Sequence, residues 1–181
     1  METRITITEA LSEVNLIKKK IETKKQKIQG AVVRHSHLED PYATEGGSAK
    51  YIERENHAVR DLYSRLVKIR SRIADANLHN EITINGKTMP IQDWLTWKRE
   101  VAKDYEQYVK GVCQQTDNSF SQLGRSPQVY KNDKGETCLL QYTANINLPE
   151  WQREAESVQD TFQQLDGQLS LKNATITILL N

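Results

Sequence analysis

Apolar residues recur every three or four positions along the first half of the chain. Over residues 8–29 the series is Leu11, Val14, Ile17, Ile21 and Ile28, with Lys24 or Lys25 at its gap. Over residues 49–79, only Glu55 or Asn56 interrupts a seam that consists of Ile52, Val59, Leu62, Leu66, Ile69 and Ile73. This spacing is typical of amphipathic helices that pack in bundles or coiled coils. We therefore predict a helix over each range, the first capped by Thr8.

The second half carries two further helical patterns. Residues 90–115 open with Pro90, which suits a first helical turn, and contain Ile91, Trp94, Leu95, Val101, Tyr105, Tyr108 and Val112. Residues 148–171 follow Asn147, a good N-cap, and their apolar positions alternate steps of four and three through Trp151, Ala155, Val158, Phe162, Leu165 and Leu169. We predict a helix over each range, separated by a polar loop at 115–128.

Short β-elements lie between and after these helices. Asn85-Gly86 predicts a hairpin at 81–89, and Asn132 to Gly135 predicts a second one at 129–143. In the tail, threonine alternates with an apolar series, Ile176, Ile178 and Leu180. This tail should form a strand that pairs with one of the hairpins or with a neighbouring chain.

Together these elements predict an α+β fold that is mostly α. We expect one domain over residues 1–181, an antiparallel helical bundle of coiled-coil hairpins with two short β-hairpins and the tail strand. The seams of the second and fourth helices are longer than a small monomer readily covers. We therefore expect them to serve as core and as contacts in a homo-oligomer.

Charge and composition narrow the function. The formal net charge is +1, which argues against a general nucleic-acid binder, although 1–30 carry a balance of +3 and 149–181 one of -3. No apolar run reaches the length of a membrane span and no leader pattern is present. We therefore expect cytoplasmic synthesis and no membrane partner. Cys113 and Cys138 are expected to be free thiols in a reducing compartment, with a pairing between them left open.

The best metal-like cluster is His35-Ser36-His37, with Glu39 and Asp40 nearby. In an extended segment both imidazoles would point the same way and share an ion with a carboxylate. A solvated or interface loop is the preferred interpretation, because no second histidine or cysteine pair follows at ligand spacing. We therefore predict no metal and no cofactor.

Three other features have a structural and a functional interpretation. Gly46-Gly47-Ser48 resembles a phosphate loop, but glycines that let a helix start explain it better. The lysines between 18 and 27 are typical of a solvated helix face rather than a nucleic-acid site. Trp94 and Trp97 are expected in core or subunit contacts. No catalytic signature is present, so we predict that the protein is not an enzyme.

Three stretches resemble a family of small bacterial and phage-encoded proteins labelled septicolysin-like. They are Ile7 to Leu11 running into Ile17 to Ile21, then Ile69 to Asn77 with Asn85 to Thr88, and Trp151 through Leu165-Asp166-Gly167 to Thr175. The resemblance implies a helical, oligomeric protein, and it carries over no catalytic residue.

We therefore expect a non-enzymatic structural or assembly protein that forms homo-oligomers. The preferred setting is a phage or virus particle, as a capsid decoration or cement protein or a tail-accessory protein that contacts capsid or tail proteins in the virion. The alternatives are a stand-alone septicolysin-like oligomer with a binding or toxin-like role, and a metal-dependent enzyme centred on His35 and His37.

Overall fold

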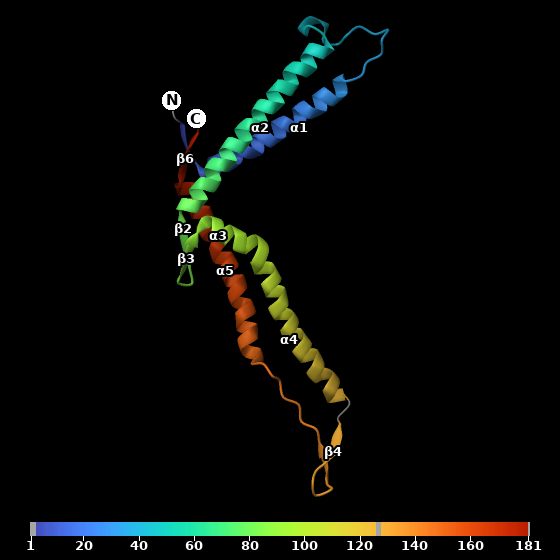
Figure 1. The fold of residues 1–181 in the computed structure, drawn as a ribbon, viewed down its shortest axis with the longest axis vertical. Helices are drawn as coiled ribbons and strands as arrows, with labels where there is room; N and C mark the ends of the chain where they lie inside the picture. Colours follow the sequence, from blue (N-terminus) through green and yellow to red (C-terminus); the bar gives the residue numbers. More distant parts are fainter. Residues whose placement is uncertain (1–2, 126–127, 181) are drawn as a thin grey trace. The chain divides into compact units, whose positions relative to one another are not determined.

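The computed structural model describes residues 3–125 and 128–180, and it confirms the predicted α+β, mostly α fold (Figure 1). The described residues divide into two compact units. Unit 1 takes those of Met1–Asn80 and Leu169–Asn181, and unit 2 those of Glu81–Gln168. A division by contacts does not measure whether the units unfold together, so the single domain stays a prediction.

Unit 1 is built on two helices that lie side by side, α1 (Ile7–Ala31) and α2 (Ser48–His79) (Figure 1). A loop with a short 3-10 turn, η1 (Ala43–Glu45), joins them. Their apolar seams face each other, and the buried cluster consists of Ile7, Ala10, Val14, Ile17, Ile21, Val59, Ile69, Ile73 and Ile178. The polar interruptions of the two seams also meet, because Lys24 Nζ lies 2.7 Å from Glu55 Oε2.

A two-stranded antiparallel sheet lies at one end of this helix pair. It consists of β1 (Thr3–Thr6) and β6 (Thr177–Leu180), with Ile5 opposite Ile178 and Thr3 opposite Leu180. The prediction of a tail strand is confirmed. The two hairpins were the wrong partners within the chain, however, because the tail pairs with a strand near residue 3 of its own chain, and pairing with a neighbouring chain stays a prediction.

The first helix begins earlier than its sequence predicted. Thr6, not Thr8, is the N-cap: Thr6 Oγ1 accepts from Glu9 N at 3.2 Å, and Glu9 Oε2 accepts from Thr6 N at 2.7 Å. This capping box satisfies two backbone donors at once. It also ends β1, so the chain turns from strand to helix at a single residue.

Unit 2 opens with the predicted hairpin, β2 (Glu81–Ile84) and β3 (Lys87–Pro90), turned by Asn85 and Gly86 at positive φ. The chain then enters α3 (Ile91–Thr96), a π-helical turn η2 (Trp97–Val101), and α4 (Ala102–Arg125) without a break. Trp94 is buried, and its Nε1 donates to the carbonyl of Ile82 at 2.9 Å. The indole therefore ties this helix to the hairpin.

The prediction of a polar loop at 115–128 is wrong for residues 115–125, because α4 continues through them to Arg125. Thr116 and Ser119 donate from their hydroxyls to the carbonyls of Val112 and Gln115, one turn back. These bonds let polar residues sit in a helix without competing with its backbone. Residues 126 and 127 of the predicted loop lie outside the described residues.

The second hairpin and the last helix also differ in length from the prediction. The strands β4 (Val129–Lys131) and β5 (Thr137–Leu139) pair antiparallel, so the hairpin is shorter than 129–143. The helix α5 (Leu148–Thr175) ends four residues beyond 171 and contributes to both units. The carbonyl of Lys172 accepts from Ile176 N at 2.8 Å, which joins the helix end directly to the tail strand.

Candidate interaction surfaces

The predicted seam residues line the helix contacts within the chain. On α2, Val59, Ile69 and Ile73 are buried, whereas Ile52, Leu62 and Leu66 are half-buried. On α5, Leu165 is buried, whereas the half-buried members are Trp151, Val158, Phe162 and Leu169. In the tail, Ile178 belongs to the core, and Ile176 and Leu180 pack against it. These seams thus build the core, and their sharing between subunits stays a prediction.

His35 and His37 are exposed at the loop between α1 and α2, with ring centroids 5.5 Å apart. Over residues 3–125 and 128–180, no group of three or more His, Cys, Asp and Glu side chains is placed to hold a metal. The nearby carboxylate, Asp40, has other partners. The structure therefore brings the two imidazoles together without a third ligand.

Asp40 binds the start of α2. Its carboxylate accepts from Ser48 N at 2.9 Å, from Ser48 Oγ at 2.6 Å and from Tyr42 N at 2.9 Å. Gly46 and Gly47 have φ near +92°, so the chain turns sharply before Ser48. The hydrogen bonds from Ser48 and Tyr42 lower the pKa of Asp40 from 3.8 to about 2. The glycines therefore start a helix, and a carboxylate of the chain occupies the place that a phosphate would take.

The remaining candidates have structural contacts. Lys24 pairs with Glu55, and Lys25 Nζ lies 5.7 Å from the ring centroid of Tyr63. Trp97 meets Trp94 edge to face, with ring centroids 5.6 Å apart. Both cysteines are free, Cys113 buried and Cys138 half-buried.

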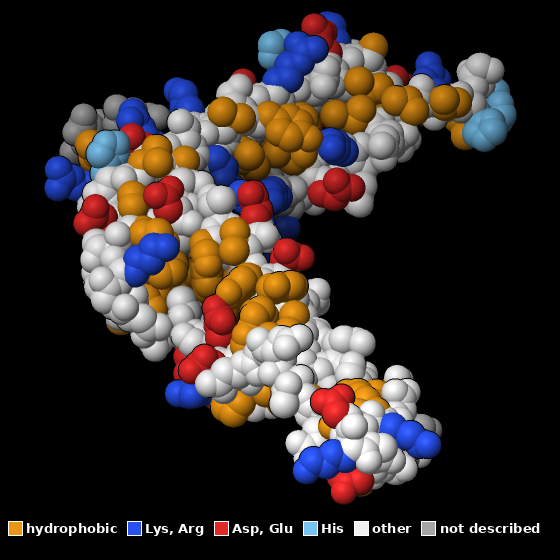
Figure 2. Space-filling model, turned by 60° about the horizontal axis from the view of Figure 1, so that its bottom comes forward, with side chains coloured by type: hydrophobic (Ala, Val, Ile, Leu, Met, Phe, Trp, Pro, Cys, Tyr) orange, Lys and Arg blue, Asp and Glu red, His pale blue; other side chains and the backbone are white. Residues whose placement is uncertain are grey.

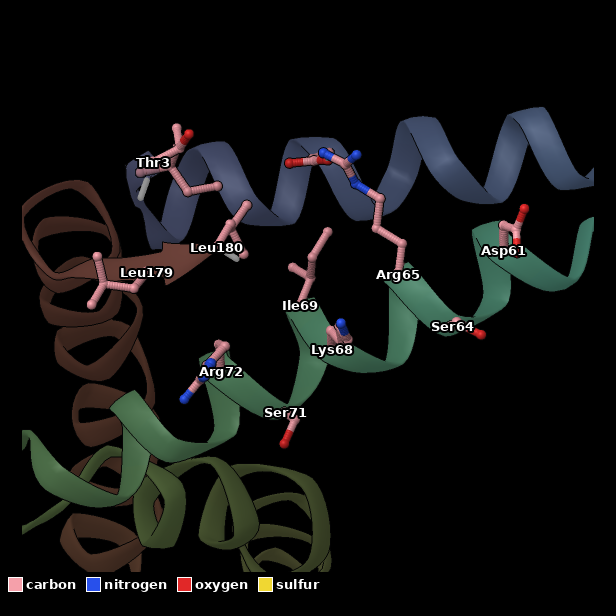
Figure 3. Close-up of a pocket in the computed structure, with 12 residues that line it drawn as sticks. Thr3, Asp61, Ser64, Arg65, Lys68, Ile69, Ser71, Arg72, Leu179 and Leu180 are labelled. Carbon is pink, nitrogen blue, oxygen red and sulfur yellow. The ribbon is translucent and has the colours of Figure 1, made fainter. Parts of the chain in front are cut away.

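A groove in unit 1 lies beside the small sheet, with a cavity volume of about 600 Å³ (Figure 3). Its apolar surface comes from Ile5, Leu179 and Leu180, above the buried Ile69, and α2 lines it with three cations, Arg65, Lys68 and Arg72. We call this the basic groove. Figure 3 shows Arg65 reaching toward α1, where it pairs with Glu13. Among the described residues, Lys68 and Arg72 have no ion-pair partner.

A stripe of large and mostly exposed apolar side chains runs from the last residue of η2 onto α4 in unit 2. Val101, Tyr105 and Tyr108 are 45%, 39% and 57% exposed, and with Val112 they recur at helical spacing. The neighbouring line on the same helix, Ala102, Val109 and Cys113, is buried. We call the exposed line the aromatic stripe. Figure 2 shows hydrophobic side chains gathered in patches rather than spread evenly over the face in view.

Both tyrosines of the stripe contact α5. Tyr108 meets Trp151 with ring centroids 6.0 Å apart, and Tyr105 Oη donates to Glu154 Oε1 at 2.5 Å. This hydrogen bond to the carboxylate raises the pKa of Tyr105. Both tyrosines therefore hold a fixed position against α5 while much of each ring stays open to solvent.

The residues of the stripe could be recognised in the sequence by their helical spacing, but the groove could not be predicted. The spacing from Val101 to Val112 is visible in the sequence, although it does not tell which line of α4 another helix covers. The groove depends on Thr3, Ile5 and Leu180 meeting α2, and the pairing of the two chain ends carries no local signal. The dense cations at Arg65, Lys68 and Arg72 are the one available clue.

No protein-family model, curated protein or solved structure gives a significant match to the chain. Among the described residues, no helix is both long enough and apolar enough to cross a lipid bilayer.

Proposed function

We propose that this protein is a non-enzymatic structural component that assembles into homo-oligomers through the aromatic stripe of α4. The observation that carries the proposal is the exposure of Val101, Tyr105 and Tyr108 in one line on a helix whose adjacent line is buried. Scattered exposed apolar residues are ordinary on a protein surface, whereas a contiguous aromatic line is a typical contact for another protein.

Two properties of the stripe favour a specific contact over non-specific hydrophobic association. Tyrosine supplies a large contact area at a low cost in side-chain entropy, and it is enriched among the residues that dominate binding energy. The contacts of Tyr105 with Glu154 and of Tyr108 with Trp151 restrict both side chains before any partner binds. Less entropy is then lost on association.

The setting that we favour is a phage or virus particle, in which the protein would serve as a capsid decoration, cement or tail-accessory component. An exposed apolar stripe suits a component that is held by its neighbours. Copurification with a particle, measured by mass spectrometry of isolated virions, would support this part of the proposal.

The oligomer is tested by sedimentation velocity of the full-length protein at micromolar concentration. We expect a defined species larger than the monomer. Tyr108→Glu places a charge in the stripe and should weaken association by about 2 kcal/mol, or roughly 30-fold in Kd. The control is Gln107→Glu, which adds the same charge at an exposed position on another side of α4.

A wild-type protein that sediments as a monomer throughout this range would contradict the proposal. So would equal effects of Tyr108→Glu and Gln107→Glu, because the response would then depend on charge alone. Circular dichroism of both variants should match the wild type, since both positions are exposed.

A further inference from the structure

The basic groove has a mixed chemistry that points to a particular kind of partner. Ile5, Leu179 and Leu180 give it an apolar surface, while Lys68 and Arg72 carry charge without an ion-pair partner among the described residues. Glu13 is engaged by Arg65 at the rim. A segment that combines apolar side chains with carboxylates would therefore complement the groove.

Charge is divided unequally between the two units. The sequence of unit 1 holds 16 Lys and Arg against 11 Asp and Glu, a net charge of +5, whereas unit 2 holds 9 against 13, a net charge of -4. Opposite charges of this size steer two molecules toward a contact between unlike units, because like units repel each other.

The aromatic stripe carries carboxylates of its own. Asp104 is exposed and lies one helical turn before Tyr108, so both share a face of α4. On the α5 edge, the carboxylate of Glu154 accepts the hydroxyl of Tyr105. The stripe thus presents aromatic rings flanked by negative charge, which is the complement of an apolar groove lined by Lys68 and Arg72.

We propose that the basic groove of unit 1 receives the aromatic stripe of unit 2 from a second copy of this chain. This inference rests on the proposed function and names the surface that the stripe meets. The contact is heterologous, because each copy uses one surface as donor and a different one as acceptor. Such contacts close into rings when the rotation between copies closes, and otherwise they continue as filaments.

A nucleic acid is the main alternative occupant of a cationic groove. The lining of this one also includes Glu13 and Asp61, and its apolar part consists of the aliphatic side chains of Ile5, Leu179 and Leu180 rather than the aromatic rings on which bases stack. A protein segment is the better complement. Binding of a labelled single-stranded oligonucleotide that is lost with Lys68 and Arg72 would overturn our assignment in favour of nucleic acid.

The test uses two full-length variants. The groove variant is Lys68→Glu with Arg72→Glu, and the stripe variant is Tyr108→Glu. Each should associate much more weakly than the wild type when alone, and should therefore be monomeric at a concentration near the Kd of the wild type. An equimolar mixture should form a one-to-one complex and nothing larger, because only one intact groove and one intact stripe remain in each pair. The control, Arg60→Glu with Arg70→Glu, makes the same charge change on α2 at exposed residues outside the groove and should assemble as the wild type does.

The outcomes separate this inference from the proposed function. If the wild type is monomeric, both fail. If the wild type assembles and the groove variant assembles equally well by itself, the stripe pairs with something other than the groove, and only this inference is overturned. A measurement without any variant checks the same point: a contact between opposite charges should weaken about tenfold or more as salt rises from low to high ionic strength. An assembly that is insensitive to salt would contradict it.

Discussion

At the scale of single residues, polar side chains decide where the helices of unit 1 begin. Thr6 and Glu9 cap α1 reciprocally. At the start of α2, the carboxylate of Asp40 accepts the hydrogen bond of Ser48 N, eight residues further along the chain. The N-cap of α2 is Gly47, which has no side chain to accept a hydrogen bond. A distant carboxylate therefore performs the task, and its negative charge also suits the positive end of the helix dipole.

The lowered pKa of Asp40 predicts how stability depends on acid. Because the folded-state pKa is about 2 and the ordinary value is 3.8, the carboxylate contributes stability at pH above 3.8. That contribution should be lost as the pH falls through about 2. Titration of the Asp40 carboxyl carbon by nuclear magnetic resonance measures the pKa directly.

Asp40→Asn supplies the control for this prediction. The variant keeps the side-chain shape but loses the charge, so its melting temperature should lie below that of the wild type at neutral pH. The two melting temperatures should converge near pH 2. A constant difference across this range would show that the charge of Asp40 plays no part.

At the scale of elements, the sequence predicts the helices better than the strands. The seams of α1 and α2 are readable because they run over many turns, and even their polar gaps correspond, with Lys24 beside Glu55. The end of α4 was missed because Thr116 and Ser119 look like loop residues until their hydroxyls are seen to bond one turn back. The pattern of apolar and polar residues along the sequence does not predict such side-chain hydrogen bonds.

The strand β1 was missed for a different reason. Its four residues include one strongly apolar side chain, Ile5, and the strand exists only because Leu180 and Ile178 meet it from the other end of the sequence. No periodicity within Thr3–Thr6 carries that information. The basic groove depends on the same pairing, so it could not be predicted either.

The pairing of β1 with β6 should matter to the stability of unit 1. Ile178 is buried in the core shared by α1 and α2, so Ile178→Asp would bury a charge without a partner. We expect a loss of about 3 kcal/mol or more in the free energy of unfolding, measured by urea denaturation. Thr177→Asp, at the exposed neighbouring position of the same strand, should change stability little. Equal effects would contradict the assigned register.

At the scale of the whole molecule, the division into two units raises the question of whether they unfold together. The helix α5 contributes residues to both units, and a continuous helix transmits the loss of order from one end to the other. We therefore expect one cooperative transition, as the prediction of a single domain requires.

The distribution of tryptophan allows a direct measurement. Trp94, Trp97 and Trp151 all belong to unit 2, so their fluorescence reports on that unit alone. Ile69→Ala removes buried methyl groups from unit 1 and should cost about 3 kcal/mol. The fluorescence midpoint should fall together with the midpoint measured by circular dichroism, whereas Val67→Ala, at an exposed position of α2, should move neither. An unmoved fluorescence midpoint for Ile69→Ala would mean that the units are separate domains.

The pairing of β1 with β6 also fixes how this protein would respond to mechanical force. Thr3 and Leu180 lie opposite each other at one end of the short antiparallel ladder. A force applied through these two residues would act on that end of the ladder first. The hydrogen-bonded residue pairs would then break one after another, rather than all at the same time. A particle that tethered the protein through both strands would open this sheet at low force and expose Ile178. Tethering through only one of the strands would leave the ladder unloaded, and the sheet would survive.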